Sequence, residues 1–221
     1  MLDIRFRLIM ITLIGLLVAG IWTLPRWYPL LSEEEVIDAF PGLAQEFQME
    51  FVSLPRNQQN AYLEIYNGNA DDEIPPRPDL ATALVVTRLT GEDVLVQEDV
   101  PFAVPAGSTI ARSGTFTTVD AVRIARGEVT IYGLPDQNRV LRLGDEFFVT
   151  LLPGTELIFT RNPDPYDARG VGVDYISMGR IQGNAGGQTY IVPASVNFSV
   201  YPILALYVPE YDYVLSTATL R

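Results

Sequence analysis

The chain has 221 residues, of which 48% are hydrophobic and 19% are charged, a balance typical of a folded protein with a sizeable core. Its net charge of −12 argues against nucleic acid as a partner, because phosphate binding requires clustered arginine or lysine. The chain has no cysteine, histidine or lysine, which excludes disulfides, thiolate metal sites, Schiff-base chemistry and a Ser-His-Asp hydrolase.

An uncharged apolar segment near the N-terminus, residues 8–24, predicts a membrane helix. A helix of this length spans roughly 25 Å, slightly less than a hydrocarbon core of about 30 Å. Arg5 and Arg7 precede the segment, so we expect Met1 in the cytoplasm and the rest of this single-pass cell-membrane protein outside. The anchor and its flanks occupy residues 1–31. The alternative is a cleaved signal peptide, although no clear cleavage site follows the segment.

Residues 32–66 predict an acidic helical neck. Ser32 and Glu35 have the spacing of a capping box, and Pro41 and Pro55 should divide the segment into short helices. Apolar residues recur at helical spacing at Val36, Phe40, Leu43, Phe47, Phe51 and Leu54. We expect this apolar stripe to pack on the following domain. The alternative is a surface for self-association or for a partner helix.

Residues 67–80 have the composition of a linker, with Asn-Gly, three consecutive acids and three prolines. Oxygen-bearing side chains that calcium could use cluster here, at Asn67, Asn69, Asp71, Asp72 and Glu73. Their order is not that of an EF-hand loop, so we expect a solvated linker and no metal site.

From Ala81 to Arg221 the sequence predicts a single β domain. Its first strands are expected at Thr82–Leu89 and Val94–Gln97. Further short runs are expected to form strands at 115–118, 121–125, 128–132, 139–143, 147–151, 157–160, 173–177, 189–192, 203–207 and 213–219. Short strands separated by Gly and Pro turns are typical of an antiparallel sandwich or a jelly-roll-like barrel. The predicted fold class is therefore all-β, preceded by a membrane helix and a short helical neck.

The segment Gly179–Tyr190 is rich in glycine but lacks the features of a nucleotide loop. No Lys-Ser or Lys-Thr follows the glycines, and a predicted strand comes next instead of a helix. Glycines permit positive φ, and Asn184 and Gln188 can form hydrogen bonds with the loop backbone. We therefore predict a structural turn between two strands.

Several stretches of the chain together resemble one known domain, the "electron transfer DM-thirteen" family, a module that precedes DOMON domains in Knickkopf-type proteins. The matching stretches are 114–143, 154–159, 175–193 and 216–220, within about residues 105–221. The most specific residues are Gly179, Gly183, Asn184, Gly186, Gly187, Gln188, Tyr190 and Pro193, which we expect to be structural. The resemblance implies an all-β fold and an extracytoplasmic setting. The redox role proposed for the family depends on a Cys, whose place Val208 takes here, after Tyr207.

These observations lead to three hypotheses of function. The first is a membrane-anchored, extracytoplasmic β module that binds an unknown protein or small molecule, with no catalytic residue, cofactor or metal. The alternative is electron transfer, as the resemblance implies, for which Met178 is the only methionine in the matched region. The second alternative is an enzyme that uses paired carboxylates. The candidates for that chemistry are Glu128, Asp145, Glu146, Glu156 and Asp174.

Overall fold

The structure is a computed structural model that describes residues 39–69, 75–97, 102–166 and 170–221. All of these residues belong to one compact unit, Ala39–Arg221. The predicted membrane segment and the predicted capping box lie outside the described residues. Within the described ranges, no helix combines the length and the apolar character that a membrane crossing requires.

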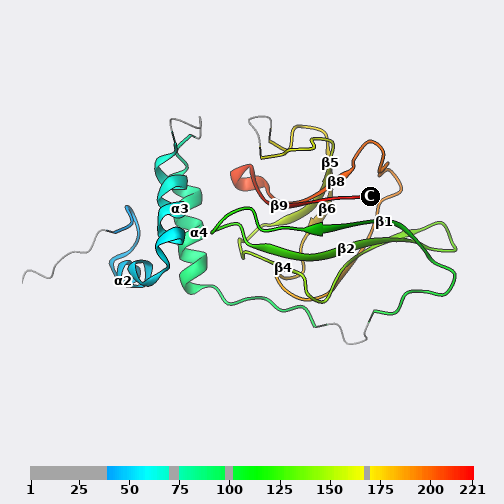
Figure 1. Cartoon of the computed structure of the whole chain (residues 1–221), viewed down its shortest axis with the longest axis horizontal. Helices are drawn as coiled ribbons and strands as arrows, with labels where there is room; N and C mark the ends of the chain where they lie inside the picture. Colours follow the sequence, from blue (N-terminus) through cyan, green and yellow to red (C-terminus); the bar gives the residue numbers. More distant parts are fainter. Residues whose placement is uncertain (1–38, 70–74, 98–101, 167–169) are drawn as a thin grey trace, which may run out of the picture. The chain divides into compact units, whose positions relative to one another are not determined.

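The described residues contain three α-helices, shown in Figure 1 as α2 (Gln45–Ser53), α3 (Arg56–Asn67) and α4 (Pro78–Thr90). Helices α2 and α3 fall where the apolar stripe predicted helices. Pro55 is the N-cap of α3, as its position in the sequence predicted. Phe40, Leu43 and Phe51 of the stripe are buried in the main hydrophobic core, with half-buried neighbours packed against them. The stripe therefore stabilises this unit.

Helix α4 corrects the prediction of a strand at Thr82–Leu89. The segment is rich in β-branched residues, which favour strands by propensity. Pro78 at the helix start, Asp79 in the first turn and Arg88 in the last turn favour a helix instead. The buried residues Leu80, Ala81, Leu84 and Val85 form one helical face. Tertiary packing thus overrides propensity, and the predicted linker ends earlier than expected.

Nine strands lie in the described part of the chain, and every pair within the two sheets is antiparallel. They are β1 (Thr109–Phe116), β2 (Ala125–Gly133), β3 (Arg139–Leu143), β4 (Phe148–Val149), β5 (Glu156–Thr160), β6 (Tyr175–Arg180), β7 (Gln188–Ile191), β8 (Ile203–Val208) and β9 (Tyr213–Thr219). The first sheet has the order β1-β2-β3-β7 with β4 paired to β2, and the second has the order β6-β5-β8-β9. The sheet-rich, antiparallel prediction is confirmed. The predicted strand at Val94–Gln97 is only an isolated bridge between Leu95 and Ala185.

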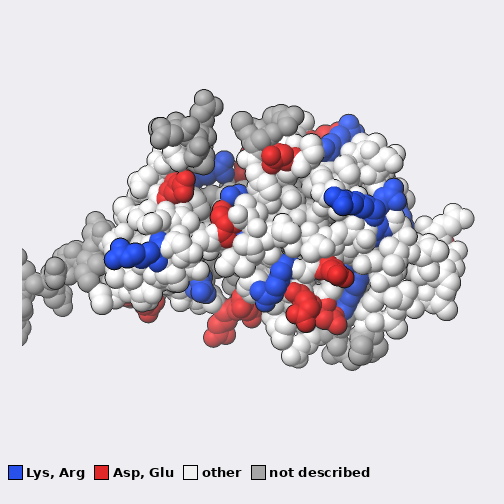
Figure 2. All heavy atoms as spheres, in the orientation of Figure 1, with Lys and Arg blue, Asp and Glu red and all other residues white. Residues whose placement is uncertain are grey.

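The two sheets lie one over the other (Figure 1) and share a hydrophobic core. Ile131 and Leu141 of the first sheet and Leu157 and Leu206 of the second are fully buried in it. The same core includes Tyr62 of α3. On the face drawn in Figure 2, acidic and basic side chains are interspersed among uncharged ones.

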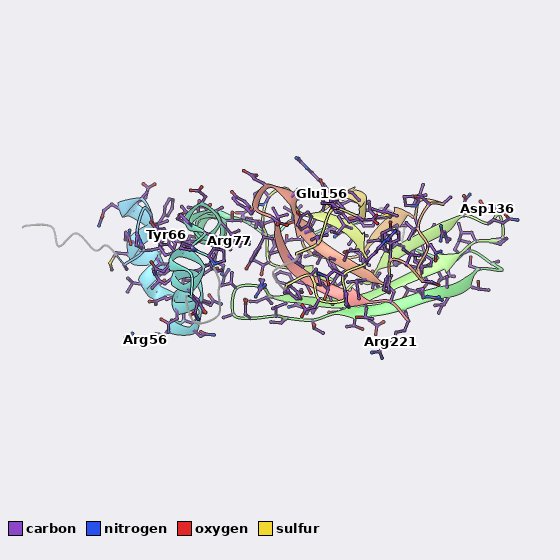
Figure 3. All side chains as sticks on the ribbon, turned by 90° about the horizontal axis from the view of Figure 1, so that it is seen from above. Arg56, Tyr66, Arg77, Asp136, Glu156 and Arg221 are labelled. Carbon is purple, nitrogen blue, oxygen red and sulfur yellow. The ribbon has the colours of Figure 1, made fainter. Side chains whose placement is uncertain are left out.

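The edges of the two sheets are joined on one side. Ser113 of β1 exchanges two backbone hydrogen bonds with Arg221, of 3.0 and 2.9 Å, and Arg221 is labelled in Figure 3. A Cβ atom at Gly114 would lie 2.7 Å from the carbonyl oxygen of Thr219, so glycine permits this approach. The other edges, β6 and β7, follow one another in the chain. Residues 181–187 connect them, and we call this connection the seam loop.

Candidate functional site

The seam loop has a buried polar interior in which Asn184 is fully buried. Asn184 Oδ1 accepts a hydrogen bond of 2.6 Å from the Val94 N–H. Its Nδ2 donates to Asp93 Oδ1 at 2.8 Å and to the Val149 carbonyl at 3.1 Å. One amide therefore connects the loop to β4 and to residues 93–96, which are distant in sequence.

Gln188 supplies the second buried amide of this region, and it is also fully buried. Its Oε1 accepts hydrogen bonds from the Gln182 N–H at 3.1 Å and the Tyr190 hydroxyl at 2.5 Å. Its Nε2 donates to the Gly183 carbonyl at 2.8 Å. Burial raises the pKa of the Tyr190 phenol above its ordinary value. These bonds satisfy polar groups that would otherwise be costly to bury.

The glycines of the seam loop lie where other groups approach its backbone. A Cβ at Gly183 would overlap the Val94 carbonyl oxygen, and one at Gly186 would lie 2.6 Å from the Val96 carbonyl oxygen. Gly186 also has a φ of +86°, which disfavours side-chain-bearing residues. The 93–96 segment lies against the loop, with the Val96 N–H donating to the Ala185 carbonyl at 2.9 Å. Sequence reasoning predicted the turn but missed this neighbouring segment.

The remaining loop residues singled out by the sequence have separate places. Gly179 lies in β6 with a φ of +89°, and no atom would meet a Cβ there within 4 Å. The Pro193 carbonyl accepts a hydrogen bond of 2.9 Å from Arg139 Nη2. A Cβ at Gly187 would overlap the Arg142 guanidinium and the Asp145 carboxylate. Gly187 therefore gives this ion pair room to form beside the loop.

Beside the seam loop lies a surface hollow of about 580 Å³, which we call the outer hollow. It is lined by Leu95, Val96, Phe102, Val104, Tyr132, Arg142, Gly144, Asp145, Gly186 and Gly187. Its volume falls within the range of about 300–1,000 Å³ typical of ligand pockets. Its lining combines apolar and aromatic side chains with the Arg142–Asp145 pair and glycine backbone. The lining comes from four separate stretches of the sequence, so no single motif could have predicted it.

An arginine holds the polar side of the outer hollow in place. Arg142 Nη2 lies 2.7 Å from Asp145 Oδ1, and Arg142 Nη1 donates to Thr189 Oγ1 at 3.1 Å. The guanidinium carbon lies 5.0 Å from the centre of the Phe102 ring, which lies 5.7 Å from the Tyr132 ring. The Arg142 side chain is 12% exposed, whereas that of Asp145 is 87% exposed. The carboxylate is therefore positioned by Arg142 and still open to solvent.

An apolar row crosses the same face of the first sheet. Ile110 is paired with Tyr132, Tyr132 with Val140, and Val140 with Ile191. Residues directly opposite one another in an antiparallel pair project from the same face. Ile110 is 66% exposed and Ile191 is 79% exposed, and Leu95 and Val104 in the hollow are also exposed. Apolar side chains thus gather on this surface.

The five candidate carboxylates have different neighbours, although Asp145 and Glu146 are adjacent in the connection between β3 and β4. Glu128 faces Thr115 across the β1–β2 pair, Asp145 pairs with Arg142, and Glu146 is exposed. Glu156 accepts a hydrogen bond of 2.7 Å from Ser177, and Asp174 lies 2.9 Å from Arg161. Among the described residues, no three acids gather in a way that could hold a metal ion. Of the oxygen-bearing side chains noted in the expected linker, Asp71, Asp72 and Glu73 lie outside that part of the chain.

The positions related to the suspected redox role are packed inside the fold. Val208 is fully buried, and Met178 is half-buried against the core. The Tyr207 hydroxyl donates to Asp212 Oδ1 at 2.9 Å. Comparison of the chain with protein-family models, curated proteins and solved structures gives no match. The resemblance to the DM-thirteen family therefore stays a prediction.

Proposed function

We propose that this protein is a membrane-anchored, extracytoplasmic β module of the sandwich or jelly-roll-like type that binds a partner without catalysis. The observation that carries the proposal is the outer hollow, where Phe102 and Tyr132 lie beside a fixed ion pair. Aromatic residues and arginine are the residue types that contribute most to binding at interfaces. The surrounding exposed aliphatic side chains make the surface suited to contact.

The construction of the hollow also favours binding, because its boundary is held in place before any ligand arrives. The buried Asn184 amide connects the seam loop to residue 94 and to β4. Arg142 is held by Asp145 and Thr189. A preorganised site loses less conformational entropy on binding than a mobile one.

The polar groups of the hollow suit recognition better than carboxylate catalysis. Glycoside hydrolysis, the model for a carboxylate-pair enzyme, needs two carboxyl groups about 5–10 Å apart. Among the described residues of the lining, Asp145 is the carboxylate, and it is paired with Arg142. An ion pair of this kind orients a surface, and these residues offer it no second acid or base.

Photo-crosslinking tests the binding proposal. We would place a photoreactive benzoylphenylalanine at Val104 in the hollow and, as a matched control, at the exposed Val119 outside its lining. Irradiation of intact cells should give a discrete adduct with one partner at position 104 and no such adduct at position 119. Identical adducts at both positions, or none at either, would overturn the proposal.

The location is proposed from the uncharged segment 8–24, the preceding arginines and the DM-thirteen resemblance. Protease added to intact cells should remove an epitope placed after Arg221. An epitope that is cleaved only after lysis would contradict the outside orientation.

A further inference from the structure

We infer that the outer hollow receives a basic, extended segment of a partner protein, in which arginine or lysine is flanked by bulky apolar residues. This inference rests on the proposed binding function and adds the chemical class of the partner. It follows from the carboxylate, the aromatic pair and the apolar row of this surface.

The lining of the outer hollow presents the carboxylate of Asp145 to solvent. Arg142 and Asp145 are its charged residues, and the guanidinium is largely buried, with its donors directed to Asp145 and Thr189. Asp145 is exposed, and the neighbouring Glu146 is exposed as well. A ligand cation therefore meets carboxylates at the rim, whereas a ligand anion would meet like charge there. The net charge of −12 for the whole chain adds long-range attraction for basic partners.

The aromatic pair supplies a second attraction for a cation. The Arg142 guanidinium carbon lies 5.0 Å from the centre of the Phe102 ring. The Tyr132 ring lies beside the Phe102 ring, with 5.7 Å between the two ring centres. Arginine and lysine are attracted to the faces of such rings at distances up to about 6 Å. A basic side chain of a partner can thus contact a ring and the Asp145 carboxylate in the same hollow.

The apolar row explains why the segment should be extended and partly apolar. Ile110, Tyr132, Val140 and Ile191 lie on neighbouring strands, which are about 4.8 Å apart. The row is therefore roughly 14 Å long, the length of about four extended residues. In an extended segment, alternate side chains lie on one face, so a basic residue can reach the hollow while apolar residues two positions before and after it contact this row.

Three matched peptides test the inference against the purified full-length chain in a zwitterionic detergent. Each is a fluorescein-labelled pentapeptide in which valine occupies the first and fifth positions and serine the second and fourth. The third position, on the same face as the valines, is arginine, serine or glutamate. Fluorescence anisotropy should show the arginine peptide binding about fivefold to tenfold more tightly than the serine peptide, and the glutamate peptide binding most weakly.

Substitutions test which side chains of the hollow determine the affinity for the peptides. Asp145→Asn should weaken the arginine peptide about threefold and leave the serine peptide unchanged. Phe102→Ala should weaken both peptides about tenfold. Glu210→Gln removes an exposed carboxylate outside the lining of the hollow and should leave the affinities of both peptides unchanged.

Three outcomes would overturn the inference. If the glutamate peptide binds as tightly as the arginine peptide, or if Asp145→Asn has no effect, the partner is not basic. The binding function would then still stand if Phe102→Ala weakened the complex. If no peptide binds, the extended basic class is wrong, and the crosslink at Val104 decides separately whether the hollow binds any partner.

Discussion

The two sides of the seam loop have opposite chemical character. On the inner side, the polar residues Asn184 and Gln188 are fully buried and hydrogen-bonded. Around the outer hollow, the apolar residues Leu95 and Val104 are exposed. On the inner side, polar side chains are therefore buried where apolar ones are usual. On the outer side, apolar side chains are exposed where polar ones are usual. The contrast suggests that the inner side serves stability and the outer side serves contact, a division that four substitutions can test.

The largest loss of stability is expected from Gly183→Val. The new side chain would overlap the Val94 carbonyl, so the 93–96 segment would have to leave the loop and the hydrogen bond to Asn184 would be lost. We expect a loss of about 3 kcal/mol or more in the free energy of unfolding. Chemical denaturation of the full-length chain in detergent measures it. Gly144→Ala is the control, because its Cβ would meet its nearest atom at 3.5 Å; equal stability of the two variants would contradict a tightly packed inner side.

Asn184→Ala should cause the next largest loss of stability. It takes the donor from the buried Val149 carbonyl and removes the bonds to the Val94 N–H and to Asp93, which lie at the partly exposed margin of the loop. An unsatisfied buried polar group costs about 1–3 kcal/mol. The melting temperature should therefore fall clearly, whereas Asn138→Ala, in the exposed β2–β3 turn near the Asp136 labelled in Figure 3, should change it little. Similar melting temperatures for both variants would argue against this account.

Tyr190 makes the inner side sensitive to alkaline pH. Burial raises its pKa in the folded state, so the unfolded chain loses the phenolic proton first as the pH rises above about 10. The stability contributed by the neutral phenol is complete below pH 10 and is lost as the pH rises toward the folded-state pKa. Tyr190→Phe should reduce the decline in melting temperature between pH 10 and 11. An unchanged decline would mean that Tyr190 does not contribute to it.

The smallest effect on stability is expected from Phe102→Ala on the outer side. Its ring is half-buried, and Arg142 keeps its bonds to Asp145 and Thr189 without it. The free energy of unfolding should fall by about 1 kcal/mol or less, while binding at the hollow weakens about tenfold. A melting temperature as low as that of Asn184→Ala would show that the outer side is also structural, and the comparison would fail.

The sequence predicted those features whose signals are local. The helical spacing of Phe47 and Phe51 and the position of Pro55 indicated α2 and α3, and short alternating runs indicated most strands; Phe40 and Leu43 of the same stripe precede α2. The prediction failed at 82–89, because β-branched residues there form a helix that packs in the core. It also placed Asn184 and Gln188 in hydrogen bonds with the loop backbone. Gln188 does bond to Gly183, but the bond from Val94 to Asn184 joins residues 90 positions apart.

The outer hollow could not be predicted, because its parts meet only in the folded chain. Gly187 is required by the Arg142–Asp145 pair, and the exposed aliphatic residues come from separate elements. A single sequence gives no signal that pairs such positions. The composition still limited the chemistry, since the absence of cysteine and histidine left arginine, acids and aromatic residues to form a site.

The junction between β1 and β9 has a consequence for the rate of folding. The Ser216 hydroxyl reaches the Thr117 carbonyl across 99 positions of sequence, so joining these strands closes a long stretch of chain. Contacts between such distant residues form slowly, and we expect this junction to form after the transition state. Gly114→Ala, which would crowd the Thr219 carbonyl, should then speed unfolding in stopped-flow experiments and leave the folding rate nearly unchanged. The lifetime of the folded protein would depend on how firmly these two strand ends stay together.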